Sequence, residues 1–347
     1  MNVRWMKYSL AFVLPGCTAM SFSSHGFLTF LPVVFAFVII PIADALVGAD
    51  SKNREKMESE LARTDRWYDM MIYLTVPVQV GMLIWFLFVV DDSASSAMET
   101  VGRVLSMGLM CGVFGINVAH ELGHRSRPYE KVMAKMMLST SLYMHFFIEH
   151  NRGHHRNVGT PEDAASARPG EDVYSFYLRT LTGSFASAWR IVSKERSRRG
   201  QGVWSLGNEM IQYLFIEIGI CVLIGYVFGP FTLLMFLIAA LIGMLLLESV
   251  NYIEHYGLKR NKVSEHRYEE VQAWHSWNSD FVIGRLVLFE LTRHSDHHWD
   301  PSKPYQVLDS MPRSRELPAG YPAMIITALI PPLWFSVMDK RLAFTMQ

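Results

Sequence analysis

Cysteine and charge are both scarce in this sequence, and each shortage excludes a class of protein. The three cysteines, Cys17, Cys111 and Cys221, lie far apart in apolar stretches and form no C-x-x-C pair. A disulfide framework, a thiolate metal site and a fused cysteine-ligated iron domain are therefore unsupported. Only 18% of the 347 residues are charged, whereas soluble domains carry about 25%. The formal net charge is zero, so no broad positive field favours nucleic acid. The composition favours a membrane protein.

The first apolar run begins like a secretory signal peptide but lacks a cleavage site. Arg4 and Lys7 precede an apolar run that begins at Tyr8. This run continues through Pro15 and Gly16 into a second apolar segment, without the small-residue cleavage site of a signal peptide. We therefore expect a retained first membrane span.

Half of the residues are apolar, and they are concentrated in long runs. A membrane-spanning helix needs about 20 mostly apolar residues. The segments that approach or meet this length are Tyr8–Ser24, Phe27–Val47, Tyr68–Val90, Met98–Ala119, Met210–Phe228 and Phe231–Asn251. The sequence therefore predicts an all-α, polytopic membrane protein with six transmembrane helices.

The positions of lysine and arginine predict the orientation of these spans, because cytoplasmic loops are enriched in both. The basic residues in the loop after the second span are Lys52, Arg54, Lys56, Arg63 and Arg66. The short connections 91–97 and 229–230 contain no Lys or Arg. We therefore expect both termini to be cytoplasmic, together with the long segment 120–207 and the tail from residue 256. These two segments would form one cap beneath the bundle.

Two apolar segments of this cap are too short or too interrupted to span comfortably. They are Lys131–Phe147 and Tyr321–Val337, and the second contains Pro331 and Pro332. Interfacial or re-entrant helices are the expected form. Because the chain has no internal repeat and no low-complexity linker, residues 1–347 are interpreted as a single domain.

Nine of the 13 histidines fall in short clusters at or just beyond the predicted cytoplasmic ends of spans. These nine are His120 and His124 in HELGH, His150, His154 and His155 in EHNRGHH, His255 in NYIEHYGL, and His294, His297 and His298 in RHSDHH. Helical positions three and four apart share a face, so each cluster is expected to aim two or three imidazoles at one point. This spacing predicts metal ligands.

The remaining histidines are weaker candidates. His25 is expected on the opposite side of the membrane and His266 in a charged loop, so neither is expected to bind metal. His145 and His275 lie nearer to the boxes but outside their spacing.

HELGH alone also matches the H-E-x-x-H helix of zinc metalloproteases. A catalytic zinc takes three protein ligands and a water, which would leave most of the boxed histidines unexplained. Nine imidazoles instead suit two metals with four or five ligands each, although imidazole binds Zn, Cu, Fe and Ni alike. A metal transporter would place ionisable residues through its spans. Here the histidines gather at one end, and Glu217 and Glu248 are isolated mid-span groups.

A histidine ligand binds as neutral imidazole, with its second nitrogen held by a carboxylate or a carbonyl. The carboxylates near the boxes that are candidates for this role are Glu121, Asp163, Glu254 and Asp296. Because the predicted cap meets the hydrocarbon of the bilayer, a lipophilic substrate that enters from the membrane is expected.

The boxes together resemble the integral-membrane alkane 1-monooxygenases, or alkane hydroxylases, within the wider histidine-box superfamily of desaturases and hydroxylases. The similar segments are HELGHR (120–125), HFFIEHNRGHHRNVGTPED (145–163), NYIEHYGL (251–258) and LTRHSDHH (291–298). Similarity also runs through RRGQGVWSLGNE (198–209), WHSWNS (274–279) and LPAGYPAM (317–324), and so covers most of the chain after about Asp65. The continuation GTPEDAASARPGE departs slightly from the family pattern and leaves the metal site intact.

This resemblance implies a six-helix bundle in the bacterial inner (cytoplasmic) membrane, with two non-haem iron ions held by the nine boxed histidines. The implied reaction is O2-dependent terminal hydroxylation of medium-chain n-alkanes to 1-alkanols, with the second oxygen atom reduced to water. The implied electron donor is a rubredoxin served by an NAD(P)H-dependent rubredoxin reductase. No flavin or nicotinamide motif occurs in the chain itself.

Two questions stay open within this resemblance. The boxes also fit a hydroxylase of alkyl-aromatic or terpenoid substrates, or a lipid desaturase, although the contexts NYIEHYGL and HSDHH favour the alkane branch. A basic stretch can steer an acidic electron carrier or bind lipid headgroups. Its residues are Lys194, Arg196, Arg198 and Arg199.

Overall fold

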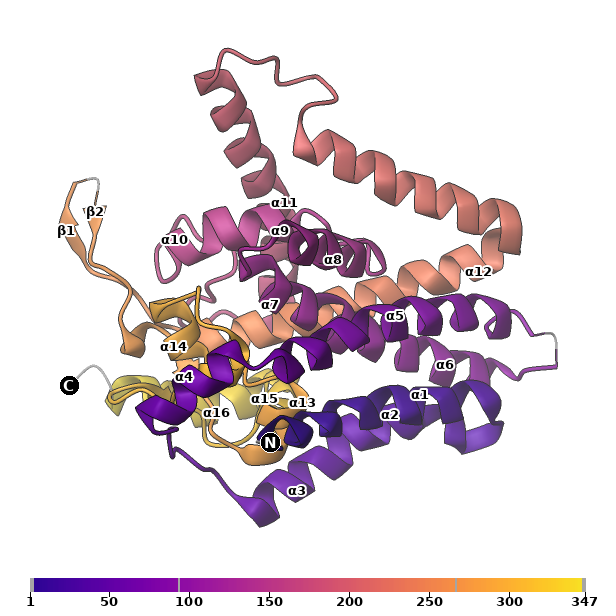
Figure 1. Cartoon of the computed structure of the whole chain (residues 1–347), viewed down its shortest axis with the longest axis horizontal. Helices are drawn as coiled ribbons and strands as arrows, with labels where there is room; N and C mark the ends of the chain where they lie inside the picture. Colours follow the sequence, from indigo (N-terminus) through magenta and orange to yellow (C-terminus); the bar gives the residue numbers. More distant parts are fainter. Residues whose placement is uncertain (1–2, 93, 266, 345–347) are drawn as a thin grey trace.

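The chain is mostly helical in the computed structural model, which describes residues 3–92, 94–265 and 267–344 (Figure 1). The longer helices are α1 (Val13–Ser23), α5 (Arg66–Val89), α6 (Ala97–Met110), α8 (Pro128–Ser139), α11 (Val173–Arg198), α12 (Glu209–His255) and α16 (Pro331–Phe344). The shorter α-helices are α2 (Leu31–Val34), α3 (Ile40–Val47), α4 (Lys56–Thr64), α7 (Ala119–His124), α9 (Phe146–Glu149), α10 (His155–Asn157), α13 (Val282–Val287), α14 (His294–Trp299) and α15 (Tyr321–Ala328). The π-helical segments are η3 (Phe35–Ile39), η4 (Cys111–Val118) and η5 (His150–His154), and the 3₁₀ segments are η1 (Arg4–Phe12), η2 (Gly26–Phe30), η6 (Ala273–His275) and η7 (Tyr305–Val307).

Short strands are a departure from the all-α prediction. β1 (Lys262–Ser264) pairs antiparallel with β2 (Arg267–Tyr268), and β3 (Trp277–Asn278) pairs in parallel with β4 (Arg315–Glu316). The β1–β2 pair projects from the body of the molecule (Figure 1). Strands of two or three residues are too short to leave an alternating apolar pattern, so the sequence could not reveal them.

Within the described residues, four helical stretches are long and apolar enough to cross a membrane. They are Gly26–Val47, Arg66–Val89, Ala97–His124 and Glu209–His255. The bent pair of α15 and α16, with an angle of 118° between its helices, would be a fifth. The chain is therefore a membrane protein with four or five candidate spans, and the predicted number of six is not confirmed.

Two local features explain the difference in the number of spans. The fifth and sixth predicted spans are the two halves of α12, which is broken at Gly229 (φ 86°, ψ 171°) and resumes at Pro230. Such a backbone conformation favours glycine, and proline suits the first turn of the helix that follows. The predicted span Tyr8–Ser24 is divided into the 3₁₀ segment η1 and the 11-residue α1, so it contains no single long helix.

The spans place the histidine boxes at one end of the molecule. The connection between α5 and α6 and the break in α12 lie at the right in Figure 1, whereas α10 and α14 lie towards the left. This arrangement agrees with the predicted hairpins, whose short connections lie opposite the cap.

Close helix packing fixes the positions of two boxes relative to each other. η4 leads directly into the HELGH helix α7, and it packs on α12 where Gly112 faces Gly243. A Cβ on Gly243 would lie 2.5 Å from the Cβ of Cys111 and 3.0 Å from the backbone nitrogen of Gly112. Small residues at such a crossing let two backbones approach closely. The glycines thus hold the helix that carries His120 against the helix that ends at His255.

Candidate metal centre

All nine boxed histidines meet in one place, where they form two groups. The five-histidine group consists of His120, His124, His150, His155 and His297. The four-histidine group consists of His154, His255, His294 and His298. Within each group the ligand nitrogens lie within 4.8 Å of one another. The groups are adjacent, since the rings of His155 and His298 are 4.5 Å apart.

The distances between ring nitrogens fit metal coordination. The Nε2 atom of His155 lies 2.9 Å from Nε2 of His150 and 3.1 Å from Nε2 of His124. In the other group, Nε2 of His154 lies 3.2 Å from Nε2 of His298. Two nitrogens that bind one metal at about 2.0–2.1 Å and at right angles are about 3 Å apart. Facing lone pairs at this distance repel unless a cation lies between them. Each group can therefore hold a metal ion.

π-helical geometry explains why His154 and His155 belong to different groups. η5 is a π-helix, whose hydrogen bonds join residues five apart instead of four. His150 and His155, which are five apart, therefore lie in the same group, whereas His154 lies in the other. α14 is divided similarly, because His297 joins the five-histidine group while His294 and His298 join the other. Each of these two boxes thus aims two imidazoles at one group and its third at the other.

Burial keeps most of these rings neutral. It lowers the pKa of His150, His155, His294, His297 and His298 well below 6.5, and neighbouring histidines lower it further. A neutral ring is the form that binds a metal. The cap segments thus supply imidazoles in the protonation state that a metal would require at neutral pH.

His154 differs because it has a carboxylate partner. Burial alone would lower the pKa of His154, but the Asp163 carboxylate raises it above the ordinary value. Nδ1 of His154 lies 2.9 Å from Oδ2 of Asp163, which also accepts a hydrogen bond from the Ser166 hydroxyl at 2.6 Å. A carboxylate on the outer nitrogen orients the ring and raises its basicity towards a metal. Asp163 therefore has the geometry expected from the sequence.

The other carboxylate candidates are placed differently. Oε2 of Glu254 lies 3.1 Å from Nε2 of His294, the nitrogen that faces the group, while Oε1 accepts a hydrogen bond from the Tyr321 hydroxyl. Glu121 accepts hydrogen bonds from the Arg125 side chain and from the backbone of Tyr305. Asp296 accepts hydrogen bonds from the Lys303 ammonium and from the backbone of Asp309. Glu121 and Asp296 thus hold protein segments near the centre.

Histidines outside the boxes are placed elsewhere. The ring of His145 packs on Tyr143 at 4.6 Å. Nδ1 of His275 accepts a hydrogen bond from the backbone of Gln272, and His25 lies 3.4 Å from Glu99. His266 lies outside the described residues. Among the described residues, none of these rings belongs to either group.

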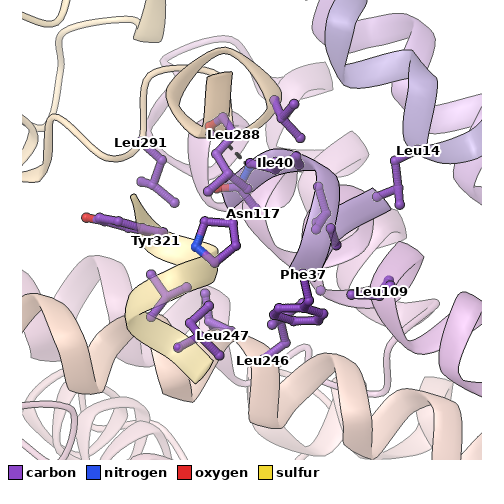
Figure 2. Close-up of a pocket in the computed structure, with 18 of the residues that line it drawn as sticks. Leu14, Phe37, Ile40, Leu109, Asn117, Leu246, Leu247, Leu288, Leu291 and Tyr321 are labelled. Carbon is purple, nitrogen blue, oxygen red and sulfur yellow. Dashed lines mark hydrogen bonds between the residues drawn. The ribbon is translucent and has the colours of Figure 1, made fainter. Parts of the chain in front are cut away.

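An apolar cavity of about 60 Å³ lies between several helices (Figure 2). Side chains from α1, η3, α6, α12 and α15 line it, including Leu14, Phe37, Leu109, Leu247 and Tyr321. Asn117, Leu288 and Leu291 line both this cavity and a smaller one of about 10 Å³. The smaller cavity reaches His120 and His297. The two cavities share these three lining residues, and we refer to the pair as the apolar passage.

Sequence reasoning missed Asn117 and the segment from Leu288 to Leu291. A signal for Asn117 was available, because it is a polar residue in an apolar run three positions before His120. Polar residues inside membrane helices are commonly functional. No comparable signal marked the leucines, since apolar residues near a span are expected everywhere.

Comparison with known proteins gives the family. The family model for fatty acid desaturases matches residues 97–328. An alkane 1-monooxygenase from Pseudomonas putida is 42% identical over 303 residues, which are 87% of this chain and 75% of the relative. The chain belongs to the alkane 1-monooxygenase family. Alkane 1-monooxygenase 1 from Pseudomonas aeruginosa is 39% identical over 339 residues, 97% of this chain and 89% of the relative.

This alkane 1-monooxygenase family member is thus an enzyme, as the boxes predicted. A more distant relative is the xylene/toluene monooxygenase hydroxylase component from Pseudomonas putida, which is 27% identical over 96% of this chain and 88% of the relative. The protease interpretation of HELGH fails on geometry. His120 and His124 share their group with His150, His155 and His297, which exceeds the three protein ligands of a catalytic zinc.

Proposed function

We propose that this enzyme uses two non-haem iron ions and O2 to hydroxylate medium-chain n-alkanes to 1-alkanols in the bacterial cytoplasmic membrane. The observation that carries this proposal is the position of two adjacent histidine groups at the inner end of an apolar passage. The relatives named alkane 1-monooxygenases are 37–42% identical, against 27% for the xylene/toluene relative. This difference favours an alkane over an alkyl-aromatic substrate.

In the proposed centre each histidine group binds one iron. The bound iron pair would supply the reduction of O2, so that one oxygen atom enters a terminal C–H bond and the other leaves as water, with two electrons and two protons consumed. The protein contributes neutral imidazoles, the Asp163 carboxylate that orients His154, and a site from which bulk water is excluded. The match to the desaturase family favours iron, and the imidazole donor set is compatible with it.

The passage accounts for the proposed preference for a chain end. Its walls are apolar, so a hydrocarbon gains the free energy of leaving water or lipid headgroups. The smaller cavity beside His120 and His297 has room for about one water-sized group. A terminal methyl group fits this space, whereas the middle of a chain would need room for a carbon on each side. Leu288 and Leu291 are therefore expected to select the terminal carbon.

We propose that the electron donor is a rubredoxin, supplied by an NAD(P)H-dependent reductase, that docks on the basic stretch at the end of α11. Lys194, Arg198 and Arg199 are exposed there. Arg196 is used internally, since its guanidinium donates hydrogen bonds to the backbone oxygens of Gly202 and Gly207. The exposed charges suit an acidic carrier and speed its association.

A charge-reversal experiment tests this docking surface. The triple variant Lys194→Glu, Arg198→Glu and Arg199→Glu is expected to slow reduction by rubredoxin at low salt and to weaken its salt dependence. The matched control reverses Arg168, Lys259 and Lys262, which line a separate depression. If the control variant is slowed and the first is not, the carrier docks on the second surface.

The experiment that tests the function is turnover by detergent-purified protein supplied with iron, rubredoxin, reductase and NADH. Incubation with n-octane under O2 is expected to give 1-octanol. Toluene oxidation without octane oxidation would assign the same chemistry to another substrate, and an alkene product would indicate a desaturase. A preparation that contains one zinc and shows no oxygenation would contradict the proposal.

A further inference from the structure

Asn117 is a polar residue that the two cavities of the apolar passage share. It lies in the π-helical segment η4, three positions before His120. It lines both the apolar cavity and the smaller cavity that reaches His120 and His297. π-helical turns occur frequently at functional sites. The Asn117 amide therefore stands between the hydrocarbon passage and the metal-binding end.

The nitrogen and the oxygen of the Asn117 side-chain amide differ in their hydrogen bonding. Nδ2 donates a hydrogen bond to the backbone oxygen of Leu288 at 3.3 Å, as Figure 2 shows. Oδ1 has no hydrogen-bond partner among the described residues, and it is buried, since Asn117 is only 6% exposed. A buried acceptor without a partner is destabilising, and such a group in a folded protein needs an explanation.

The other polar side chain that lines the larger, apolar cavity is already occupied. Among the described residues that line the apolar cavity, Asn117 and Tyr321 carry polar side chains. The Tyr321 hydroxyl donates its hydrogen bond to Glu254 at 2.7 Å. Among the described side chains that line this cavity, the Asn117 oxygen is thus the acceptor that remains for a molecule in it.

We propose that Oδ1 of Asn117 accepts a hydrogen bond from a hydroxyl group at the end of an apolar chain, so that the passage has a subsite for primary alcohols. An alkane has no O–H donor and leaves this oxygen unpaired. The alcohol formed from it places a donor beside the last carbon, where the smaller cavity has room for about one water-sized group. This inference rests on the proposed function, because the alcohol would be the product of that reaction.

The subsite makes the enzyme bind its product more tightly than a molecule of the same shape without a hydroxyl. A single hydrogen bond of this kind corresponds to a preference of about 3- to 10-fold. The same bond would hold the oxygenated carbon at the metal-binding end until the chain withdraws through the passage. Product inhibition by 1-alkanols is the kinetic consequence.

Equilibrium binding to the iron-containing full chain in detergent tests the proposal without turnover. Radiolabelled 1-octanol is displaced by unlabelled 1-octanol or by 1-chlorooctane, which has a similar length and no O–H donor, after correction for partition into empty micelles. The unmodified enzyme is expected to prefer 1-octanol about 3- to 10-fold. Equal affinity for the two ligands, as expected if an ordered water already satisfies Oδ1, would overturn the proposal.

Two variants locate the preference. Asn117→Leu keeps nearly the same size and removes the acceptor, so the affinity for 1-octanol should fall about 3- to 10-fold while that for 1-chlorooctane changes little. Leu247→Met alters the same cavity without a polar change and should move both affinities together. Unchanged 1-chlorooctane binding and iron content show that Asn117→Leu is folded, and a retained preference for 1-octanol in it would overturn the assignment.

The result of this binding experiment can be distinguished from the result of the turnover experiment with octane. If the purified enzyme shows the Asn117-dependent preference for 1-octanol but does not hydroxylate octane, the subsite stands and the alkane assignment fails. If octane is hydroxylated and the preference is absent, the subsite fails and the reaction stands.

Discussion

Replacing Asp163 by Asn would test whether the carboxylate behind His154 strengthens the metal centre. Asp163 is buried, and its two oxygens accept hydrogen bonds from the His154 ring, the Ser166 hydroxyl and the backbone of Ala165. Asparagine keeps the size and some of these bonds but removes the charge that raises the pKa of His154. Loss of such an outer carboxylate typically lowers metal affinity 10- to 100-fold, or about 1.4 to 2.8 kcal/mol.

Asp296→Asn is the matched control for this variant. Asp296 also lies next to a boxed histidine in the sequence, but its carboxylate holds Lys303 and the backbone of Asp309. Iron affinity is measured for both variants by competition with a chelator in detergent. We expect the 10- to 100-fold loss for Asp163→Asn and less than about 3-fold for Asp296→Asn. Equal losses, or full affinity in Asp163→Asn, would refute the reasoning.

Two further predictions concern pH and helix packing. Because burial holds the pKa values of His150, His155, His294, His297 and His298 below 6.5 in the folded chain, the unfolded chain takes up protons first as the pH falls. At pH values above about 6.5, the thermal unfolding midpoint of the metal-free protein should therefore stay constant. Below that pH the free energy of unfolding should fall, by at most about 1.4 kcal/mol per pH unit for each ring. A thermal midpoint that rises on acidification would contradict this prediction. Gly243→Val should destabilise the protein by about 1–3 kcal/mol, because its side chain would meet Cys111 and the backbone of Gly112. Gly219→Val in the same helix, where a Cβ meets nothing within 4 Å, is the control, and an equal loss in both variants would show that valine itself is responsible.

The meeting of the nine boxed histidines could be predicted from the sequence, because the spacing of histidines can be read without knowledge of the fold. Boxes at the ends of long apolar helices must lie at one side of a bundle, and this brought distant residues such as His120 and His298 together in the prediction. Assignment to groups could not be predicted in the same way. It depends on the π-turn at His150–His154, and an inserted residue in a helix leaves no clear periodic signal.

The outer carboxylates show the same limit. Glu121, Asp163, Glu254 and Asp296 look alike in sequence, since each lies close to a box. In the structure their side chains point in different directions. Asp163 contacts the outer nitrogen of His154, whereas Asp296 accepts a hydrogen bond from Lys303. Side-chain direction is set by tertiary packing, which a single sequence does not reveal. The predicted number of six spans is not confirmed, because the fifth and sixth predicted spans belong to the single element α12 on either side of Gly229, and η1 divides the first apolar run.

The number of metal ions bound per chain tests the proposed pair of histidine-held irons. Iron and zinc per chain would be measured by mass spectrometry in the purified unmodified enzyme and in His124→Ala, His298→Ala and His145→Ala. The account predicts two irons in the unmodified enzyme and in His145→Ala, and about one in the variants that remove a ligand from either group. A single zinc in the unmodified enzyme, or two irons retained in both His124→Ala and His298→Ala, would contradict it.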